Sequence, residues 1–142
     1  MSHEVIAIRA LESGFLRIVV SHRRVGMIDG VSIEVFGRSP ENCWREALRV
    51  DCYPKDSHVH LFPLSGKSSE ASLGDLTVLP RAILVGRDFL RINCSRILGE
   101  LGYSESAAEA GSERGQQTIE QTCDFAAEMI HGVSRGASSP DR

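Results

Sequence analysis

The stretch Asp29-Gly30-Val31-Ser32-Ile33-Glu34-Val35-Phe36-Gly37 decides the fold class of this chain. An Asp-Gly pair is typical of a hairpin turn, because both central residues of a type I′ turn need a positive φ. After that pair, apolar β-branched residues alternate with polar ones, so one side of the segment is apolar and the other polar. This pattern predicts a strand of an antiparallel sheet that packs one face on a core and leaves the other free.

Further strands are predicted on both sides of this stretch. Upstream, residues 5–8 and 15–20 are apolar and rich in β-branched side chains; downstream, residues 43–53 and 58–62 also favour strands. Strand alternation gives the segment 43–53 two different faces. One face carries Trp44 as a core anchor with Leu48 and Val50, and the other carries Arg45, Arg49, Asp51 and Tyr53. Together these segments predict an antiparallel β-meander over about residues 4–63.

The second half of the chain predicts helices. Over residues 80–101, apolar side chains recur at helical spacing and form one stripe that can cover the sheet. The stripe consists of Ile83, Leu90, Cys94, Ile97 and Leu101. Two further helices are predicted over residues 104–111 and 116–131, the second ending at Gly132. The Ser- and Gly-rich residues 64–79 predict a long loop, and the fold class we expect is α+β.

Length and composition fit one globular domain. The chain has 142 residues, of which 42% are hydrophobic and 25% charged, and we expect a single domain over residues 1–133 with a flexible C-terminal tail over 134–142. The formal net charge of −3 argues against general affinity for nucleic-acid backbones. The sequence contains neither a secretion signal nor an apolar run that could span a membrane. We therefore expect a cytoplasmic protein with four reduced cysteines.

Polar residues suited to chemistry are concentrated in residues 49–60. If one strand ends near Asp51 and the next begins at His58, alternation can bring Arg49, Asp51, His58 and His60 onto one face. Two imidazoles and a carboxylate bind divalent metal ions in several enzymes, so Asp51, His58 and His60 are candidate metal ligands. Alternatively, all four are candidate catalytic residues for metal-free phosphodiester cleavage, with histidine as acid and base and arginine stabilising charge. The remaining interpretation is a solvated face of the sheet without a site.

The same segment resembles a known family. Leu48-Arg49-Val50-Asp51-Cys52-Tyr53, then His58-x-His60, then Leu101-Gly102-Tyr103, are similar to the motifs of an uncharacterised family of small bacterial domains. Its members carry an Arg-x-Asp-Cys-aromatic motif, a Pro-His-Tyr-His-Tyr motif and a helix that ends in Gly-Tyr. The resemblance covers roughly residues 30–105 and departs at Ser57, Val59 and Leu61, where the family has Pro, Tyr and Tyr. It implies a fold and brings no activity with it.

A second resemblance concerns small toxins. Arg49-x-Asp51, a His-rich turn and Phe62-Pro63 are similar to the core of some toxins of toxin–antitoxin modules. That similarity implies a ribonuclease acting through Arg49, Asp51, His58 and His60.

Three functions therefore remain open from the sequence, which does not decide whether the protein is an enzyme. Because no complete catalytic motif is present, we place first a small accessory or interaction domain, such as a subunit of a larger complex, with a protein partner or a second copy as its ligand. The second is a metal-binding domain or metal-dependent enzyme using His58, His60 and Asp51. The third is a metal-free, toxin-like ribonuclease.

Overall fold

The computed structural model describes residues 3–138, and the side chains of residues 4–130. Within that range six strands precede three helices. The strands are β1 (His3–Ser13), β2 (Leu16–Val25), β3 (Ile28–Arg38), β4 (Trp44–Cys52), β5 (Ser57–Leu61) and β6 (Ser69–Gly74). The helices are α1 (Leu79–Glu100), α2 (Ser104–Gly111) and α3 (Glu113–Ser138). The strands form one antiparallel sheet in chain order, so the predicted α+β fold with an antiparallel meander is confirmed.

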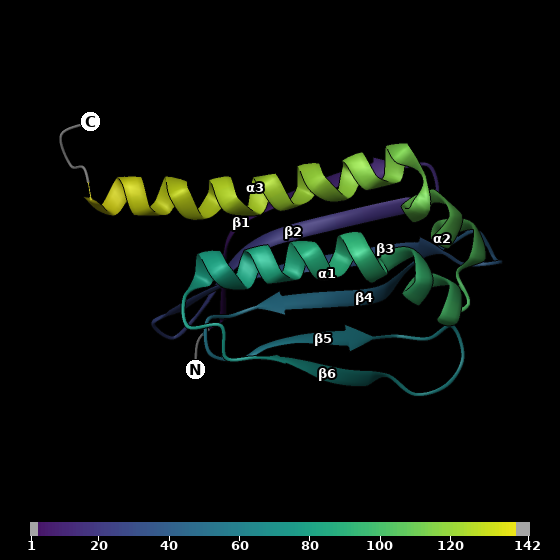
Figure 1. The fold of residues 1–142 in the computed structure, drawn as a ribbon, viewed down its shortest axis with the longest axis horizontal. Coiled ribbons are helices and arrows are strands. Elements are labelled where there is room, and N and C mark those ends of the chain that lie inside the picture. The colour runs from purple at the N-terminus through teal and green to yellow at the C-terminus, as the bar shows by residue number, and fades with distance from the viewer. Residues whose placement is uncertain (1–2, 139–142) are drawn as a thin grey trace.

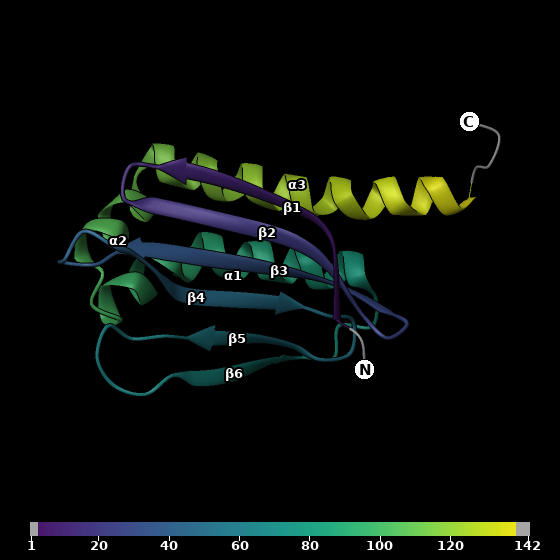
Figure 2. The same cartoon turned by 180° about the vertical axis from the view of Figure 1, so that it is seen from behind.

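The helices cover one face of the sheet. Figure 1 shows α1 and α3 lying along the strands on the near side, and Figure 2 shows the opposite face, which no described helix covers. The helix α3 packs on β1 and β2, and α1 packs mainly on β4. Between the layers lie fully buried side chains such as Ile18, Ile33 and Val50 of the sheet, Leu90 of α1 and Ile119 of α3. The alternation read from residues 31–36 therefore marks the buried face correctly.

The hairpin turn between β2 and β3 lies elsewhere than expected. Val25 pairs with Ile28, so the turn consists of Gly26 and Met27, and Gly26 supplies the positive φ of 63°. The expected turn residues Asp29 and Gly30 instead lie inside β3. A Cβ on residue 30 would lie 2.1 Å from the Tyr53 ring, so this glycine provides room for an aromatic side chain. The prediction of a turn at Asp29-Gly30 was wrong, because this glycine is needed to make room for the Tyr53 ring rather than to form a turn.

The sheet also extends further than expected. The segment 64–79, predicted as a loop, contains the edge strand β6 (Ser69–Gly74). Its side chains are mostly exposed and polar, so it lacks the apolar alternation that identifies a half-buried strand. Backbone pairing with β5 holds it in the sheet, and the meander therefore ends at Gly74 rather than near residue 63.

The face assigned to Trp44 was wrong. Phe36 pairs with Glu46 and Val35 pairs with Leu48, which leaves Ala47 as an extra residue in β4. Such a bulge reverses the alternation, so Trp44 lies on the helix-free face. There the Arg17 and Arg38 guanidinium groups stack on its ring at 4.7 and 4.8 Å from the centroid.

The helix α1 confirms the segment predicted over residues 80–101. It begins at Leu79 with Pro80 in its first turn, and the predicted apolar stripe is buried, with its last residue, Leu101, as the C-cap just after the helix. Gly86 marks a close approach to the sheet, since a Cβ there would lie 2.8 Å from the Cys52 Sγ and 3.2 Å from a Val50 methyl. A mid-helix glycine costs about 1 kcal/mol relative to alanine, and the lack of space explains its presence.

The helix α3 is longer than expected. It runs from Glu113 to Ser138 and does not end at Gly132, because one glycine costs a helix only about 1 kcal/mol. It therefore includes the first residues of the expected tail, whereas residues 139–142 of that tail lie outside the described residues. The helix predicted over residues 104–111 matches α2. Over the part of the chain that the structure describes, no helix is long and apolar enough to cross a membrane.

Candidate metal centre

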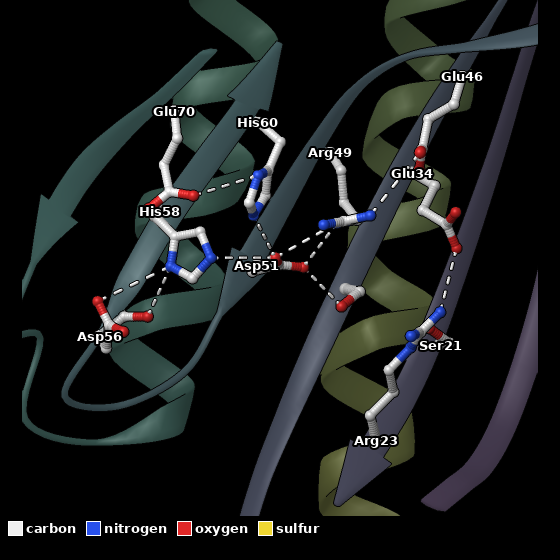
Figure 3. Close-up of polar contacts among 11 residues, drawn as sticks. Ser21, Arg23, Glu34, Glu46, Arg49, Asp51, Asp56, His58, His60 and Glu70 are labelled. Atoms are coloured by element: carbon white, nitrogen blue, oxygen red, sulfur yellow. Dashed lines mark hydrogen bonds and ion pairs between the residues drawn. The ribbon is translucent and has the colours of Figure 1, made fainter. Parts of the chain in front are cut away.

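The strands β4 and β5 bring the predicted site residues together. Asp51 pairs with His58, and Arg49 pairs with His60, across the ladder between these strands. Their neighbours Val50, Cys52 and Val59 are buried on the helix side, so alternation turns the polar residues to the helix-free face. Figure 3 shows the two imidazoles and the guanidinium converging on the Asp51 carboxylate.

The contacts around Asp51 are short and share one oxygen. Its Oδ2 atom lies 3.2 Å from the His58 Nε2 atom and 3.0 Å from the His60 Nε2 atom. One ligand atom from each of the three residues can be chosen so that all lie within 4.8 Å of one another. Asp51 is 7% exposed, and the two imidazoles are partly buried at its side. Three donors gathered this closely could hold one metal ion.

The outer nitrogens of both imidazoles have acceptors of their own. The His58 Nδ1 atom lies 3.1 Å from the Asp56 backbone carbonyl oxygen, which can only accept, so this nitrogen carries a proton. The His60 Nδ1 atom lies 3.4 Å from the carboxylate of Glu70, its partner on β6. Metal-binding histidines usually donate their second ring N–H to a carbonyl or carboxylate. Both rings thus have an acceptor beside Nδ1 and turn Nε2 to Asp51.

The Asp51 carboxylate has two further partners, Ser32 and Arg49. The Ser32 hydroxyl donates to Oδ1 at 2.7 Å, and the Arg49 Nε atom lies 3.3 Å from each oxygen. The Arg49 guanidinium also lies over the Phe62 ring at 5.7 Å from its centroid. These contacts fix the carboxylate while Oδ2 faces the imidazoles. Ser32 was not predicted as part of the site, although the sequence predicted correctly that it lies on the polar face of its strand.

A pair of carboxylates lies beside this centre. The Arg49 Nη1 atom is 3.7 Å from Glu46, and Arg23 is 3.4 Å from Glu34 (Figure 3). The pKa of Glu46 is raised from 4.5 to about 7, mainly by burial and then by the hydrogen bond to Glu34 and the charge of Glu34, whereas Arg49 lowers it. Sequence reasoning missed this pair because the bulge at Ala47 moves Glu46 onto the face of Arg49.

A large cleft adjoins the centre. It has a volume of about 1180 Å³ and lies at the end of the sheet where the β2–β3 turn, the β4–β5 turn and the start of α1 meet. Asp51, His58 and His60 line it together with the apolar side chains of Met27, Ile28 and Ile130, among others. Volumes of roughly 300–1,000 Å³ are typical of small-molecule sites, so this cleft is large enough for an organic ligand.

The cluster of Asp51, His58 and His60 has the donor atoms of a metal-binding site. Three side chains from two adjacent strands offer two nitrogens and one oxygen from the same side, which is the composition of a two-histidine, one-carboxylate site. Such a set leaves coordination positions for water or a ligand. All four predicted site residues, Arg49, Asp51, His58 and His60, lie together in one cluster. Their proposed roles remain predictions.

The chain was compared with known proteins. Residues 10–126 match a family described as a domain of unknown function (DUF7700). No curated protein and no solved structure matches the chain. The family match agrees with the expectation of an uncharacterised family and spans more of the chain than the resemblance over residues 30–105. The family motif and the bacterial origin remain predictions.

Proposed function

Since this chain belongs to the DUF7700 family of domains of unknown function, we propose from its geometry that it is a metal-binding domain. Asp51, His58 and His60 would hold one divalent transition-metal ion at the helix-free face of the sheet. A site of this kind would support a metal-dependent reaction.

One observation carries this proposal. If each Nδ1 atom bears the proton, as the acceptor beside it requires for His58, a neutral imidazole presents a lone pair at Nε2. Two such lone pairs would face the Asp51 Oδ2 atom at 3.0 and 3.2 Å, and an acceptor facing an acceptor is repulsive. Two arrangements remove that repulsion: protons on the Nε2 atoms that donate to Asp51, or one metal ion that all three atoms bind, and the proposal takes the second.

The type of donor limits the choice of metal. Calcium and magnesium prefer sites built from oxygen alone, whereas imidazole favours zinc, iron, copper and nickel. Two histidines and one carboxylate are the ligands of zinc in some hydrolases and of iron(II) in oxygenases. We therefore expect zinc or iron(II) rather than an alkaline-earth ion.

The surrounding residues have positioning roles in this proposal. Ser32 holds the Asp51 Oδ1 atom, Arg49 lies against both carboxylate oxygens, and Glu70 orients His60. A bound metal ion supplies Lewis acidity and lowers the pKa of a coordinated water. The partly exposed face of the centre leaves room for such a water.

The experiment is metal analysis followed by titration. Protein purified without an affinity tag is analysed for metals, stripped with a chelator and titrated with zinc and cobalt(II) by calorimetry. We expect one site per chain, lost in the His58→Ala, His60→Ala double variant. Asp51→Asn should weaken binding by more than about 100-fold, since even outer partners of ligands are worth about 10–100-fold.

A matched control separates ligation from surface charge. The Asp56 side chain is 85% exposed, and its backbone carbonyl meets His58, so Asp56→Asn removes a nearby charge and keeps that contact. We expect it to bind metal like the wild type. A wild type that binds no more tightly than the double histidine variant would overturn the proposal.

The second candidate is the accessory or interaction domain. The observation that favours it is the edge strand β1, whose Val5 and Ile8 are 54% and 61% exposed, because an edge strand with apolar side chains can pair with another chain. A protein without metal affinity that is dimeric by light scattering would favour this role.

The ribonuclease alternative has less support. It needs an arginine free to stabilise charge on a phosphate, whereas Arg49 and Arg23 both pair with carboxylates.

A further inference from the structure

We propose that the cleft beside the metal centre binds a small amphipathic carboxylate, with its anionic group at the metal and its apolar chain along the β2–β3 turn. This inference rests on the proposed metal site and names the class of ligand that the site would take. Three observations support it: an exposed apolar wall, the charge balance of the lining and the size of the cleft.

The apolar wall of the cleft consists of side chains that do not contribute to the hydrophobic core. Met27 is 96% exposed and Ile28 is 56% exposed, at the tip of the β2–β3 hairpin. The turn itself requires only the positive φ of Gly26, and polar residues such as Asn or Asp are usual in two-residue turns. Both side chains line the cleft, together with the partly buried Ile130 of α3. The apolar tip therefore offers a surface to a ligand rather than to the core.

The charges of the lining select an anion once a metal is bound. The cleft is lined by Arg23, Arg49 and Lys55 and by Asp29, Asp51 and Asp56, so its formal charges cancel. A divalent ion would add two positive charges in a chain whose net charge is −3. Lys55 is an exposed residue of the same lining, so the cleft carries a further cation for an anionic ligand. The carboxylate group of a ligand could bind the metal ion and also pair with the ammonium group of Lys55.

The size of the cleft leaves room for an apolar chain beside the metal centre. A volume of about 1180 Å³ exceeds what acetate or a hydrated ion occupies, and the lining passes from the charged centre to the apolar tip. A ligand with its carboxylate at the metal can therefore place several methylene groups along the apolar wall. Each buried methylene is worth about fourfold in affinity, so chain length should increase binding steeply.

The experiment uses cobalt(II)-loaded protein, because the visible absorption of cobalt reports a change of its ligands. The protein is titrated with octanoate, with acetate and with 1-octanol. Octanoate should shift the cobalt spectrum and bind at least about tenfold more tightly than acetate, given the methylenes it can bury. Acetate should produce the same shift at higher concentration, and 1-octanol should leave the spectrum unchanged.

Paired variants locate the apolar chain. In Met27→Ser, Ile28→Thr the octanoate affinity should fall severalfold toward that of acetate, while the acetate affinity stays the same. The matched control is Leu84→Ser, Ile92→Thr on α1, where side chains 50% and 77% exposed lie outside the cleft; it should bind octanoate like the wild type. Equal affinities for octanoate and acetate, or equal effects of the two double variants, would refute the inference and leave the metal site intact. Failure to bind cobalt would refute both.

Discussion

Glu46 provides a test of the electrostatics of the helix-free face. Its side chain is 25% exposed, its Oε2 atom is buried without a hydrogen-bond donor among the described residues, and Glu34 lies beside it. Burial is the largest cause that raises its pKa from the usual 4.5 to about 7, and Arg49 opposes the rise. Replacement of Glu46 by Gln keeps the shape and the hydrogen-bonding capacity and removes the charge. We expect this variant to be more stable than the wild type at high pH.

The sign follows from proton binding. Between pH 4.5 and about pH 7 the folded protein retains a proton on Glu46 that the unfolded chain has lost, so the free energy of unfolding falls as the pH rises. The pKa difference, at about 1.36 kcal/mol for each pH unit, sets an upper limit of about 3 kcal/mol. Partial exposure of the side chain reduces this value. We therefore expect Glu46→Gln to stabilise the protein by about 1–3 kcal/mol at pH 8 and to have little effect at pH 4.

Urea denaturation followed by circular dichroism measures this difference. The quantity that decides is the change in unfolding free energy on Glu46→Gln at pH 8 minus the change at pH 4, because contacts that do not titrate cancel. Glu41→Gln, in the exposed loop before β4, is the matched control and should show no pH-dependent change. If Glu46→Gln destabilises the protein at pH 8, its ionised form contributes through Arg49 more than burial costs, and the reasoning is wrong.

Two further predictions concern the core. Gly86→Ala should destabilise the protein by about 1–3 kcal/mol, because the new methyl group would overlap the sheet; Gly99→Ala, whose nearest atom would be 3.8 Å away, should stabilise it by up to about 1 kcal/mol in the same urea measurement. Native protein should react with one equivalent of a thiol reagent, at the exposed Cys43, and unfolded protein with four, because the other three cysteines are buried and free; mass spectrometry counts the adducts, and rapid labelling of more than one thiol in the native state would contradict the packing.

Much of the fold could be predicted from residue periodicity. The alternation in β3 and the helical stripe of α1 identify buried faces directly, because burial of those side chains drives both elements into place. The turn at Gly26 and Met27 was missed because Asp29 and Gly30 carry the stronger local signal. Only the structure shows that the Tyr53 ring occupies the space above Gly30. The edge strand β6 was missed because it is held by backbone pairing rather than by apolar side chains.

The candidate site could be predicted from the sequence only in part. Arg49, Asp51, His58 and His60 lie within one short segment, so a single turn between two strands suffices to bring them together. Ser32 and Glu34 come from β3, and their place beside Asp51 and Arg49 depends on the pairing register of β3 with β4. That register includes the bulge at Ala47, which no pattern in the sequence marks.

The position of the site in the sheet couples metal binding to strand pairing. In Figure 1, α1 and α3 lie over the first four strands, whereas β5 and β6 extend beyond α1. The strand β5 is held by its ladder to β4 and by the buried Val59. An ion bound by Asp51 of β4 and by His58 and His60 of β5 would link these two strands on the opposite face. A slip of one residue would turn both imidazoles toward the helices, so the ion would bind only the observed register and would stabilise it by the free energy of binding.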